Sequence, residues 1–347
     1  MPSERAPGME PAAPGADDSS GASGSTTGTA LVLRTFLSIE HGEEQEDIVC
    51  PLCGGHQPAP VLLARDLLFA RPGGYPLVRC ARCDMQYVSP RPTGAALGKH
   101  YPDDYFGYSL HEDAPRLIQP FLRAMARGIS LRRLGYLEAV TGKLSADAKL
   151  LDVGCGVNRL LSCIKDERGC VGTGLDFKPE IVAYVRERLQ LPIVQGTLES
   201  AGFADGSYDV VLMMEYLEHE LDPRGTLLEA RRVLRAGGHL ALELPYMGWA
   251  GRMFGPNWWN LDIPRHLMFF APDTLSKMLE QCGFELVSVR PFTLPLYVGM
   301  SMVQALGLRH WRKYKNIYPM LSTMLALPLV PFTALMPEFM FAVARAK

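Results

Sequence analysis

The sequence predicts an α/β fold in which helices cover both faces of a mainly parallel sheet, with a small cysteine-rich module ahead of it. Three observations support this. Strand-like and helix-like segments alternate from residue 149 onward, a glycine turn follows the first of these strands, and two Cys-x-x-C pairs lie nearer the N-terminus. Strands that alternate with helices are typical of βαβ units, whose parallel sheets are buried on both faces.

The predicted strands are short apolar runs bounded by Gly, Pro or Asp. A helix is expected over residues 179–190, with Pro179 in its first turn, and another ends near Gly237. Residues 116–140 have apolar side chains at helical spacing and predict one or two linking helices. The predicted strands cover residues 149–153, 171–176, 192–195, 208–214, 239–245, 284–291 and 338–347.

Composition divides the 347-residue chain into four parts. Hydrophobic residues make up 48% and charged residues 21%, as expected of a protein with a buried core. Residues 1–47 form an acidic tail whose first 30 residues have few large apolar side chains, so we expect disorder and no secretory signal there. A cysteine module is expected at 48–110, linking helices at 111–147, and the α/β domain at 148–347. The net charge of −2 gives no general attraction to nucleic acid.

The two Cys-x-x-C pairs predict a structural metal site. Cys50 and Cys53 are separated from Cys80 and Cys83 by 26 residues, and four thiolates in this pattern can surround a tetrahedral Zn²⁺. Iron is the alternative occupant of such a site. Four cysteines leave no open coordination position, so the expected role is structural. The other four cysteines lie in apolar segments and are expected to pack as small hydrophobic residues.

The glycine turn lies in the stretch "LLDVGCGVNRLL" (150–161). A dinucleotide fingerprint needs a small residue where this chain has Arg159, so that fingerprint fails. Asp152-x-Gly154-x-Gly156 remains, and Asp176 ends the next predicted strand. A carboxylate at that place can accept hydrogen bonds from both hydroxyls of a ribose. The turn therefore favours a nucleoside ligand without a pyrophosphate.

These residues, followed in order by "FADGSYDVVLMMEYLEHELDP" (203–223), "ARRVLRAGGHLALELP" (230–245) and "LEQCGFELVSV" (279–289), resemble class I S-adenosylmethionine (SAM) methyltransferases. The resemblance implies a Rossmann-like seven-stranded sheet with SAM over the glycine turn, its ribose on Asp176 and its adenine beside residues 196–198. Asn158 replaces the usual glycine, and Thr197 replaces the usual acid near the adenine. The implied SAM-binding residues are Asp152, Gly154, Cys155, Gly156, Asn158, Asp176, Phe177, Gly196, Thr197, Leu198 and Glu215.

A zinc-ribbon-like module in front of such a domain, with "VRCARCDMQYVSPRP" (78–92) and "HYPDDYFGY" (100–108), resembles bacterial sugar, surface-polysaccharide and natural-product methyltransferases. The resemblance implies a small-molecule, glycosyl or lipid-linked acceptor, with the module as one wall of the acceptor site. Two alternatives stay open: an RNA or protein methyltransferase that docks its substrate through the module, and an inactive SAM-fold binding protein. Nucleic acid is disfavoured, because only Arg79 and Arg82 are basic near the cysteines.

Transfer of the methyl group to a hydroxyl or carbon acid requires alignment and removal of a proton. His219, after the fourth predicted strand, and His266, in the loop after the fifth, are the candidate bases. Arg265 is expected to pair with a phosphate or carboxylate of the acceptor. A bracing role for each histidine remains the alternative. Aromatic residues in the same regions, which either line the acceptor pocket or pack against the core, are Trp258, Trp259, Tyr101, Tyr105 and Tyr108.

An uncharged stretch covers residues 316–337 inside a hydrophobic insertion at 295–337. The stretch is long enough to cross a bilayer, but its three internal prolines and the strand that follows predict that the chain returns to the sheet. A flap over the site, a dimer surface and a shallow membrane contact through 309–337 are the alternatives. The basic side chains just before it, which suit anionic lipid, are Arg309, His310, Arg312, Lys313 and Lys315. The expected location is the cytoplasm, or the inner face of the membrane.

Overall fold

The computed structural model describes residues 44–102, 116, 119–157, 159–308 and 318–347. Several predictions therefore fall outside the described residues: most of the expected disordered tail, Asn158, Tyr105 and Tyr108, and the basic group at 309–315.

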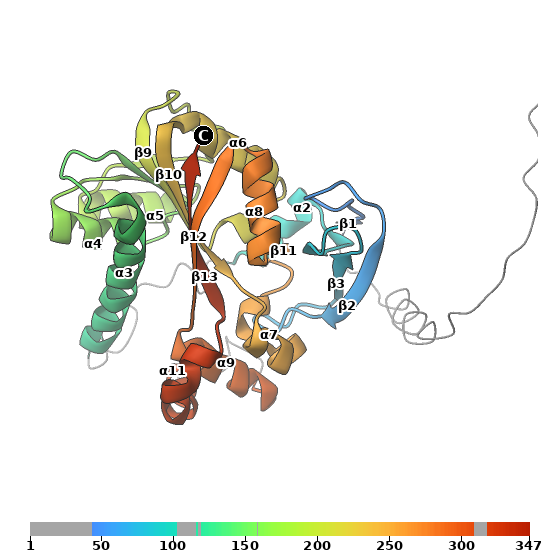
Figure 1. Ribbon diagram of the computed structural model, residues 1–347. Helices are drawn as coiled ribbons and strands as arrows, with labels where there is room; N and C mark the ends of the chain where they lie inside the picture. The colour runs from blue at the N-terminus through green and yellow to red at the C-terminus, as the bar shows by residue number, and fades with distance from the viewer. Residues whose placement is uncertain (1–43, 103–115, 117–118, 158, 309–317) are drawn as a thin grey trace, which may run out of the picture.

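A seven-stranded sheet forms the centre of the molecule, in the order β12-β13-β10-β9-β6-β7-β8 (Figure 1). Neighbouring strands from β8 to β10 are parallel, whereas β13 is antiparallel to β10 on one side and to β12 on the other. The predicted fold class is confirmed. The strands are β6 (Leu150–Val153), β7 (Thr173–Asp176), β8 (Ile193–Gln195), β9 (Tyr208–Met214), β10 (Leu234–Pro245), β12 (Phe284–Phe292) and β13 (Phe339–Ala346).

Helices cover both faces of this sheet, as the strand composition requires (Figure 1). On one face α3 (Gln119–Thr141), α4 (Arg159–Arg168) and α5 (Pro179–Tyr184), which continues as the π turn η4 (Val185–Leu189), contribute to one apolar cluster. On the other face α6 (Pro223–Val233) and α8 (Pro272–Gln281) contribute to a second cluster. Buried strands packed from both sides need apolar side chains in every direction, which is why β6 and β9 read as continuous apolar runs.

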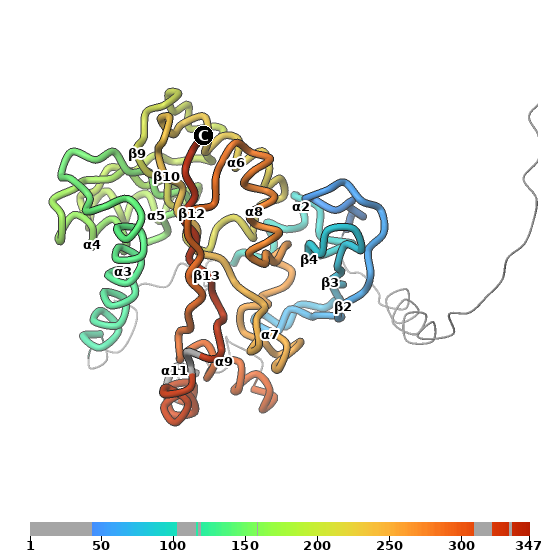
Figure 2. Tube along the Cα trace, viewed as in Figure 1, coloured from blue at the N-terminus to red at the C-terminus, as the bar shows by residue number. Residues whose placement is uncertain are grey.

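The N-terminal module is a four-stranded sheet that borrows its edge strand from the α/β domain. Its order is β11-β4-β3-β2, and β11 (Met268–Phe269) comes from the loop after β10. Figure 1 labels β11, and Figure 2 labels β4, β3 and β2. Met268 pairs with Tyr87 and Phe269 with Gln86. The remaining strands are β2 (Pro58–Ala64), β3 (Tyr75–Cys80), β4 (Gln86–Val88) and the pair β1 (Gln45–Glu46) and β5 (Arg91–Pro92).

The hydrophobic insertion folds into α9 (Pro295–Ala305), α11 (Tyr318–Ala326) and η8 (Leu327–Leu335), which return the chain to β13. A Cβ atom at Gly299 would lie 2.0 Å from the carbonyl oxygen of Ser322, so only glycine lets α9 and α11 approach this closely. Among the described helices, none has the length and apolar character needed to span a bilayer. The short connecting turns are α2 (Gly94–Leu97), η1 (Gly98–His100), η5 (Leu217–His219), α7 (Trp249–Phe254), η6 (Gly255–Asn257) and η7 (Trp259–Leu261).

Candidate active site

The glycine turn lies at the carboxyl end of β6, where parallel sheets of this kind bind their ligands. Gly154 and Gly156 have φ values of 65° and 51°, a left-handed conformation that glycine adopts without strain. A Cβ atom at Gly154 would lie 2.2 Å from the ring of Tyr216, which packs directly on the turn. The peptide N–H of Cys155 donates to the carbonyl of Leu175 at 3.0 Å, so β7 holds the turn in place.

Asp176 ends β7 and meets the glycine turn directly. Its Oδ2 accepts a hydrogen bond from the Gly156 N–H at 3.0 Å, and its Oδ1 accepts one from the Lys178 N–H at 2.9 Å. Burial raises the pKa of the Asp176 carboxyl, although both N–H groups oppose that effect. The predicted ribose-binding carboxylate is therefore next to the predicted turn. Phe177, which follows it, is 55% exposed and available to a ligand.

The remaining predicted SAM residues lie along the same edge of the sheet. Asp152 is buried at the end of β6, and burial raises the pKa of its carboxyl to about 7, with Arg133 opposing and Asp176 adding to the shift. The Gly196 N–H donates to the carbonyl of Asp176 at 3.0 Å, which brings the expected adenine segment beside the ribose carboxylate. Within that segment Thr197 is exposed and Leu198 is buried.

A buried charge network that sequence reasoning missed joins α3 to the ends of β9 and β10. Arg133 donates from Nε to Glu243 at 2.9 Å and from Nη2 to Glu215 at 3.1 Å. Burial and the neighbouring Glu243 raise the pKa of Glu215 to about 7, while Arg133 opposes them. Arg133 stands among several basic residues of an amphipathic helix, so its sequence context resembles a solvated face and carries no signal of this role.

The two predicted histidines meet at the end of β9, with ring centroids 4.6 Å apart. His266 Nδ1 lies 2.8 Å from the Asn260 carbonyl oxygen, and His219 Nδ1 lies 3.1 Å from that of Arg265 and 2.9 Å from the Tyr101 hydroxyl. A carbonyl oxygen only accepts, so Nδ1 of His266 carries the proton and its Nε2 carries the lone pair, whereas Nδ1 of His219 faces both a carbonyl and a hydroxyl that can donate to it. Burial lowers the pKa of both imidazoles, which keeps them neutral near pH 7.

Glu218 completes this cluster and was not predicted. The residue is fully buried, and its Oε1 lies 4.0 Å from Nε2 of His266. Neither carboxylate oxygen has a hydrogen-bond partner among the described residues. Burial raises the pKa of Glu218 well above its usual value, and the charges of Glu215 and Glu243 add to the effect. In the sequence Glu218 is one of several acids in "EYLEHELDP", and nothing distinguishes it from a surface carboxylate.

Arg265 has a different role from the one expected. Its side chain is fully buried, and both Nη atoms donate to Asp66 at 3.0 Å while Nε donates to Asp262 at 2.9 Å. A further donor reaches the carbonyl of His100 at 3.3 Å. Carboxylates on two sides leave the guanidinium no open face for an anionic acceptor. Arg265 instead ties the loop that carries His266 to the N-terminal module.

The two tryptophans of the same loop also anchor that loop. Trp258 is 1% exposed, and its indole N–H donates to Glu338 at 3.0 Å. Trp259 is buried against α9, and its peptide N–H donates to the Ser301 hydroxyl at 2.9 Å. Of the two alternatives predicted for these residues, the structure supports packing against the core. The loop after β10 is thus anchored at 258, 259 and 265, and His266 directly follows the last of these anchors.

The four predicted metal ligands converge in the N-terminal module. Sγ of Cys50 lies 3.5 Å from that of Cys83, and Sγ of Cys53 lies 3.5 Å from that of Cys80. Each Cys-x-x-C pair lies in a tight turn. The turn is closed by the peptide N–H of the next residue, which donates to the carbonyl of Cys50 or Cys80, and that next residue has a positive φ. Four ligands at about 2.3 Å from a zinc ion lie about 3.8 Å apart, so these sulfurs are close to a tetrahedral arrangement.

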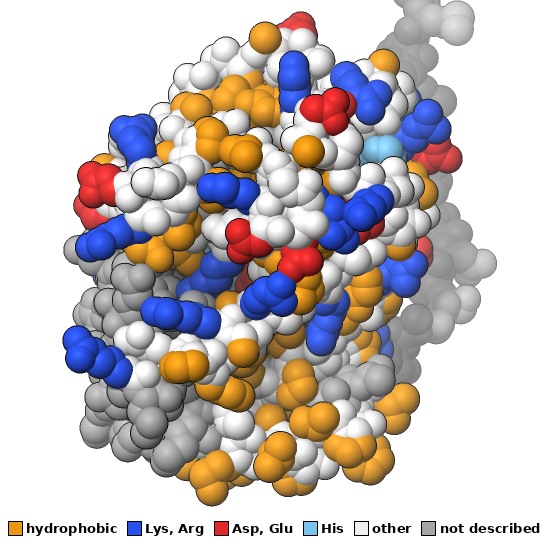
Figure 3. Space-filling view, turned by 90° about the vertical axis from the view of Figure 1, so that its left-hand side faces the viewer, with side chains coloured by type: hydrophobic (Ala, Val, Ile, Leu, Met, Phe, Trp, Pro, Cys, Tyr) orange, Lys and Arg blue, Asp and Glu red, His pale blue; other side chains and the backbone are white. Residues whose placement is uncertain are grey.

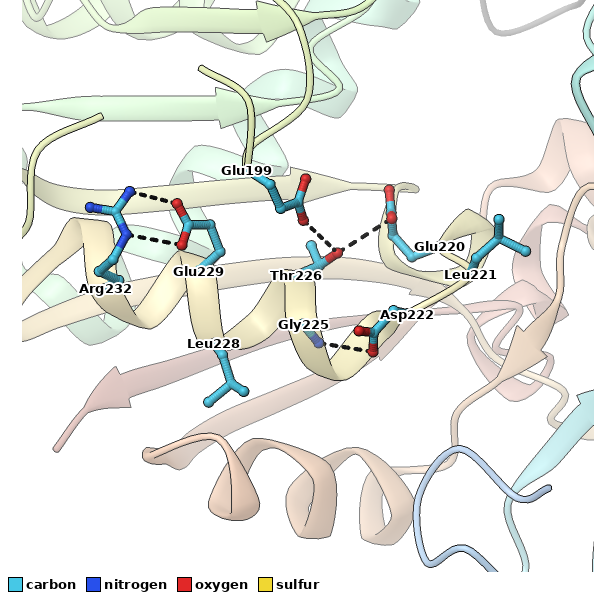
Figure 4. Close-up of a pocket in the computed structure, with 9 residues that line it drawn as sticks. All are labelled: Glu199, Glu220, Leu221, Asp222, Gly225, Thr226, Leu228, Glu229 and Arg232. Atoms are coloured by element: carbon cyan, nitrogen blue, oxygen red, sulfur yellow. Dashed lines mark hydrogen bonds and ion pairs between the residues drawn. The ribbon is translucent and has the colours of Figure 1, made fainter. Parts of the chain in front are cut away.

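A surface cavity of about 580 Å³ opens beside the N-terminus of α6 (Figure 4). Thr226 donates toward Glu199 and Glu220 across it, and Asp222 accepts from the Gly225 N–H at 3.0 Å. Its lining includes none of the residues expected to bind SAM or to take part in catalysis. The acidic side chains are satisfied by their own neighbours, so this cavity is separate from the site at the ends of β6, β7 and β9.

Known proteins share the part of the chain that forms this site. Residues 121–289 match the family model described as "Methyltransferase domain". The chain is 40% identical over 114 residues to a "Ubiquinone biosynthesis O-methyltransferase" of Cronobacter sakazakii, a match that covers 31% of this chain and 46% of that protein. A protein of the same name in Escherichia coli is 39% identical over 112 residues, covering 30% and 46%. The chain spans just under half the length of these curated relatives.

Solved structures resemble the chain at low sequence identity. Geranyl diphosphate methyltransferase, solved with GPP and sinefungin, is 14% identical with a TM-score of 0.45, over 64% of this chain and 77% of that one. The YcgJ protein of Bacillus subtilis is 16% identical with a TM-score of 0.42, over 62% and 98%. The family match, together with the strand order and the placement of Asp176 against the glycine turn, identifies a class I SAM-dependent methyltransferase domain in this chain.

Proposed function

We propose that this protein transfers a methyl group from SAM to a hydroxyl of a small-molecule acceptor. The observation that carries the proposal is the contact between Asp176 and Gly156, which supports a role for Asp176 in holding the ribose beside the turn that would hold the methionine part of SAM. Glu215 and the histidine cluster follow the neighbouring strand β9 at the same edge. Cofactor and proton-handling groups therefore share one end of the sheet, as methyl transfer requires.

SAM supplies a methyl group on a positively charged sulfur, and the protein's work is alignment and removal of the acceptor proton. Asp152, Asp176 and Glu215 would hold the cofactor from the ends of three strands. The acceptor would lie against His219 and His266, whose neutral imidazoles each carry one ring nitrogen with a lone pair. The anchored loop fixes His266, and Tyr101 from the N-terminal module contacts His219 at 2.9 Å. This contact supports the module's role as a wall of the acceptor site.

The relatives' names support a hydroxyl acceptor of small size, and glycosyl or lipid-linked acceptors remain within the proposal. A role for the module in docking RNA is less well supported, because Arg79 and Arg82 are the basic residues close to its cysteines. The four thiols support one structural zinc ion. We expect one zinc per chain, lost in Cys83→Ser and retained in Cys163→Ser, when zinc released by acid is measured with a colorimetric chelator.

The insertion supports contact with lipid or a lipid-linked acceptor. Hydrophobic side chains gather at the end of the molecule that carries α9 and α11 (Figure 3). A large exposed apolar patch usually marks an interaction surface. We propose that this patch contacts the inner face of the cell membrane. Leu327→Glu with Leu335→Glu should abolish co-sedimentation with anionic vesicles. The exposed apolar residues are Leu306, Met324, Leu327, Val330, Phe332 and Leu335.

The decisive experiment separates cofactor binding from turnover. Asp176→Ala removes the acceptor of two ribose hydrogen bonds, each worth about 1.5–3 kcal/mol to a charged group, so SAM affinity should fall about 100-fold or more by calorimetry. His266→Ala should leave SAM affinity unchanged and abolish transfer of labelled methyl to the small-molecule or lipid fraction of a cell extract. Unchanged SAM affinity in Asp176→Ala would overturn the ribose assignment, and label found in RNA or protein would overturn the acceptor class.

A further inference from the structure

Glu218, His219 and His266 form a cluster for which the hydrogen bonds of the described residues give no explanation. One potential ligand atom from each lies within 4.8 Å of the others. Both Glu218 oxygens are buried without a donor, and a buried carboxylate without a donor is costly in either protonation state. A protonated carboxyl would still leave a buried O–H without an acceptor. The cluster therefore lacks a positively charged partner.

The second observation is the way the histidines are held. His266 donates its Nδ1 proton to the Asn260 carbonyl at 2.8 Å, and the Nδ1 of His219 faces the Arg265 carbonyl at 3.1 Å. Histidines that bind metals almost always donate their other ring nitrogen in this way, which fixes the tautomer and the ring orientation.

We propose that Glu218, His219 and His266 bind one divalent cation at the acceptor end of the site. Two imidazoles and one carboxylate are the donor set of Fe²⁺, Mn²⁺ and Zn²⁺ sites that keep coordination positions open. Ligands about 2.1 Å from such a cation lie about 3.0–3.4 Å apart, so binding draws the three groups together by about 1 Å. Arg265 and Trp258 anchor the loop, and His266 directly follows Arg265.

The inference rests on the proposed function and specifies how the histidines serve it. An acceptor hydroxyl on an open position of the cation has a lowered pKa and releases its proton to water. The oxygen then forms the new bond to the methyl carbon while the carbon–sulfur bond breaks and its electron pair returns to sulfur. The products are the methyl ether and the thioether S-adenosylhomocysteine. The substrate class that fits is a hydroxyl with a second oxygen close enough to share the cation.

Mn²⁺ is the probe, because thiolates prefer softer metals and the four cysteines are first filled with zinc. Free Mn²⁺ gives an electron paramagnetic resonance signal that bound Mn²⁺ loses, so titration of the full chain measures affinity and stoichiometry without turnover. We expect one Mn²⁺ per wild-type chain and at least about 100-fold weaker binding in Glu218→Gln, as loss of a charged ligand costs several kcal/mol. Glu220→Gln, two residues away and bonded to Thr226, should bind as the wild type does.

Absence of bound Mn²⁺ in the wild type at millimolar concentration overturns the proposal, and so does equal affinity in Glu218→Gln. Circular dichroism establishes that the variant is folded, and His219→Gln serves in its place if it is not. SAM affinity is measured on the same samples. Intact SAM binding without Mn²⁺ binding refutes the cation site alone, whereas loss of SAM binding in the wild type refutes the proposed function.

Discussion

Replacing Asp66 by Asn tests the link between the N-terminal module and the loop that carries His266. Asp66 accepts two hydrogen bonds of 3.0 Å from Arg265, and both side chains are fully buried. His100 and Arg265 hold the pKa of Asp66 below its usual value against the effect of burial, so the pair contributes at neutral pH and is lost only in acid. Removing one member of a buried ion pair costs about 3–5 kcal/mol, because the other charge stays buried. We expect a loss of about 3 kcal/mol of stability in the variant.

Thermal unfolding followed by circular dichroism measures this loss, and about 3 kcal/mol corresponds to a midpoint lowered by about 4 °C in a chain of this size. Asp205→Asn is the matched control, since Asp205 pairs with Arg232 at the surface and is 81% exposed. An exposed pair contributes about 0–1 kcal/mol, so the control should unfold close to the wild type. Equal midpoints for the two variants would refute the structural role assigned to Arg265.

Two further predictions concern the turn and the loop anchor. Gly154→Ala should weaken SAM binding by about 10-fold or more, because a left-handed backbone and a clash with Tyr216 cost about 1–3 kcal/mol; Gly128→Ala, in open space on α3, should be neutral or stabilising, and equal SAM affinity in both variants would contradict the argument. Burial raises the pKa of Glu338 to about 8 against the hydrogen bond from Trp258, so the folded state holds a proton that the unfolded chain releases above about pH 4.5. Glu338→Gln should therefore gain thermal stability over the wild type at pH 8.5 but not at pH 5, and a difference independent of pH would contradict the raised pKa.

Local pattern was sufficient to predict the sheet. The predicted strand 208–214 coincides with β9 because its apolar run must be buried on both faces. The prediction for β10 began five residues late, at 239, because residues 234–238 contain two glycines and follow a helix without a break. Leu234 nevertheless pairs with Tyr208 before an irregularity in the register. Turn residues can be recognised in the sequence, whereas an irregular register between two strands depends on the partner strand.

The candidate site was predictable where its residues follow consecutive strands and not where distant segments meet. Gly154, Gly156 and Asp176 follow β6 and β7, so strand order alone brings them together. Asp66 and Arg265 are 199 residues apart, and no periodicity links them. The same holds for Arg133 and Glu243, which lie 110 residues apart. A buried charge looks like a surface charge in sequence, because what distinguishes it is a partner supplied by the fold.

The strand β11 makes the boundary between module and domain a matter of definition. Residues 268–269 belong to the methyltransferase domain along the chain but to the module's sheet in space. A protein shortened to residues 121–289, the span of the family match, would keep the loop that presents His266 and lose the strand and the carboxylate that hold it. That span also omits β13, which lies between β10 and β12, so it would keep neither the complete sheet nor the contacts that hold the loop. The module and the domain share the strand β11. Replacing either part with that of a relative would therefore also require replacing the contacts around Asp66 and Tyr87.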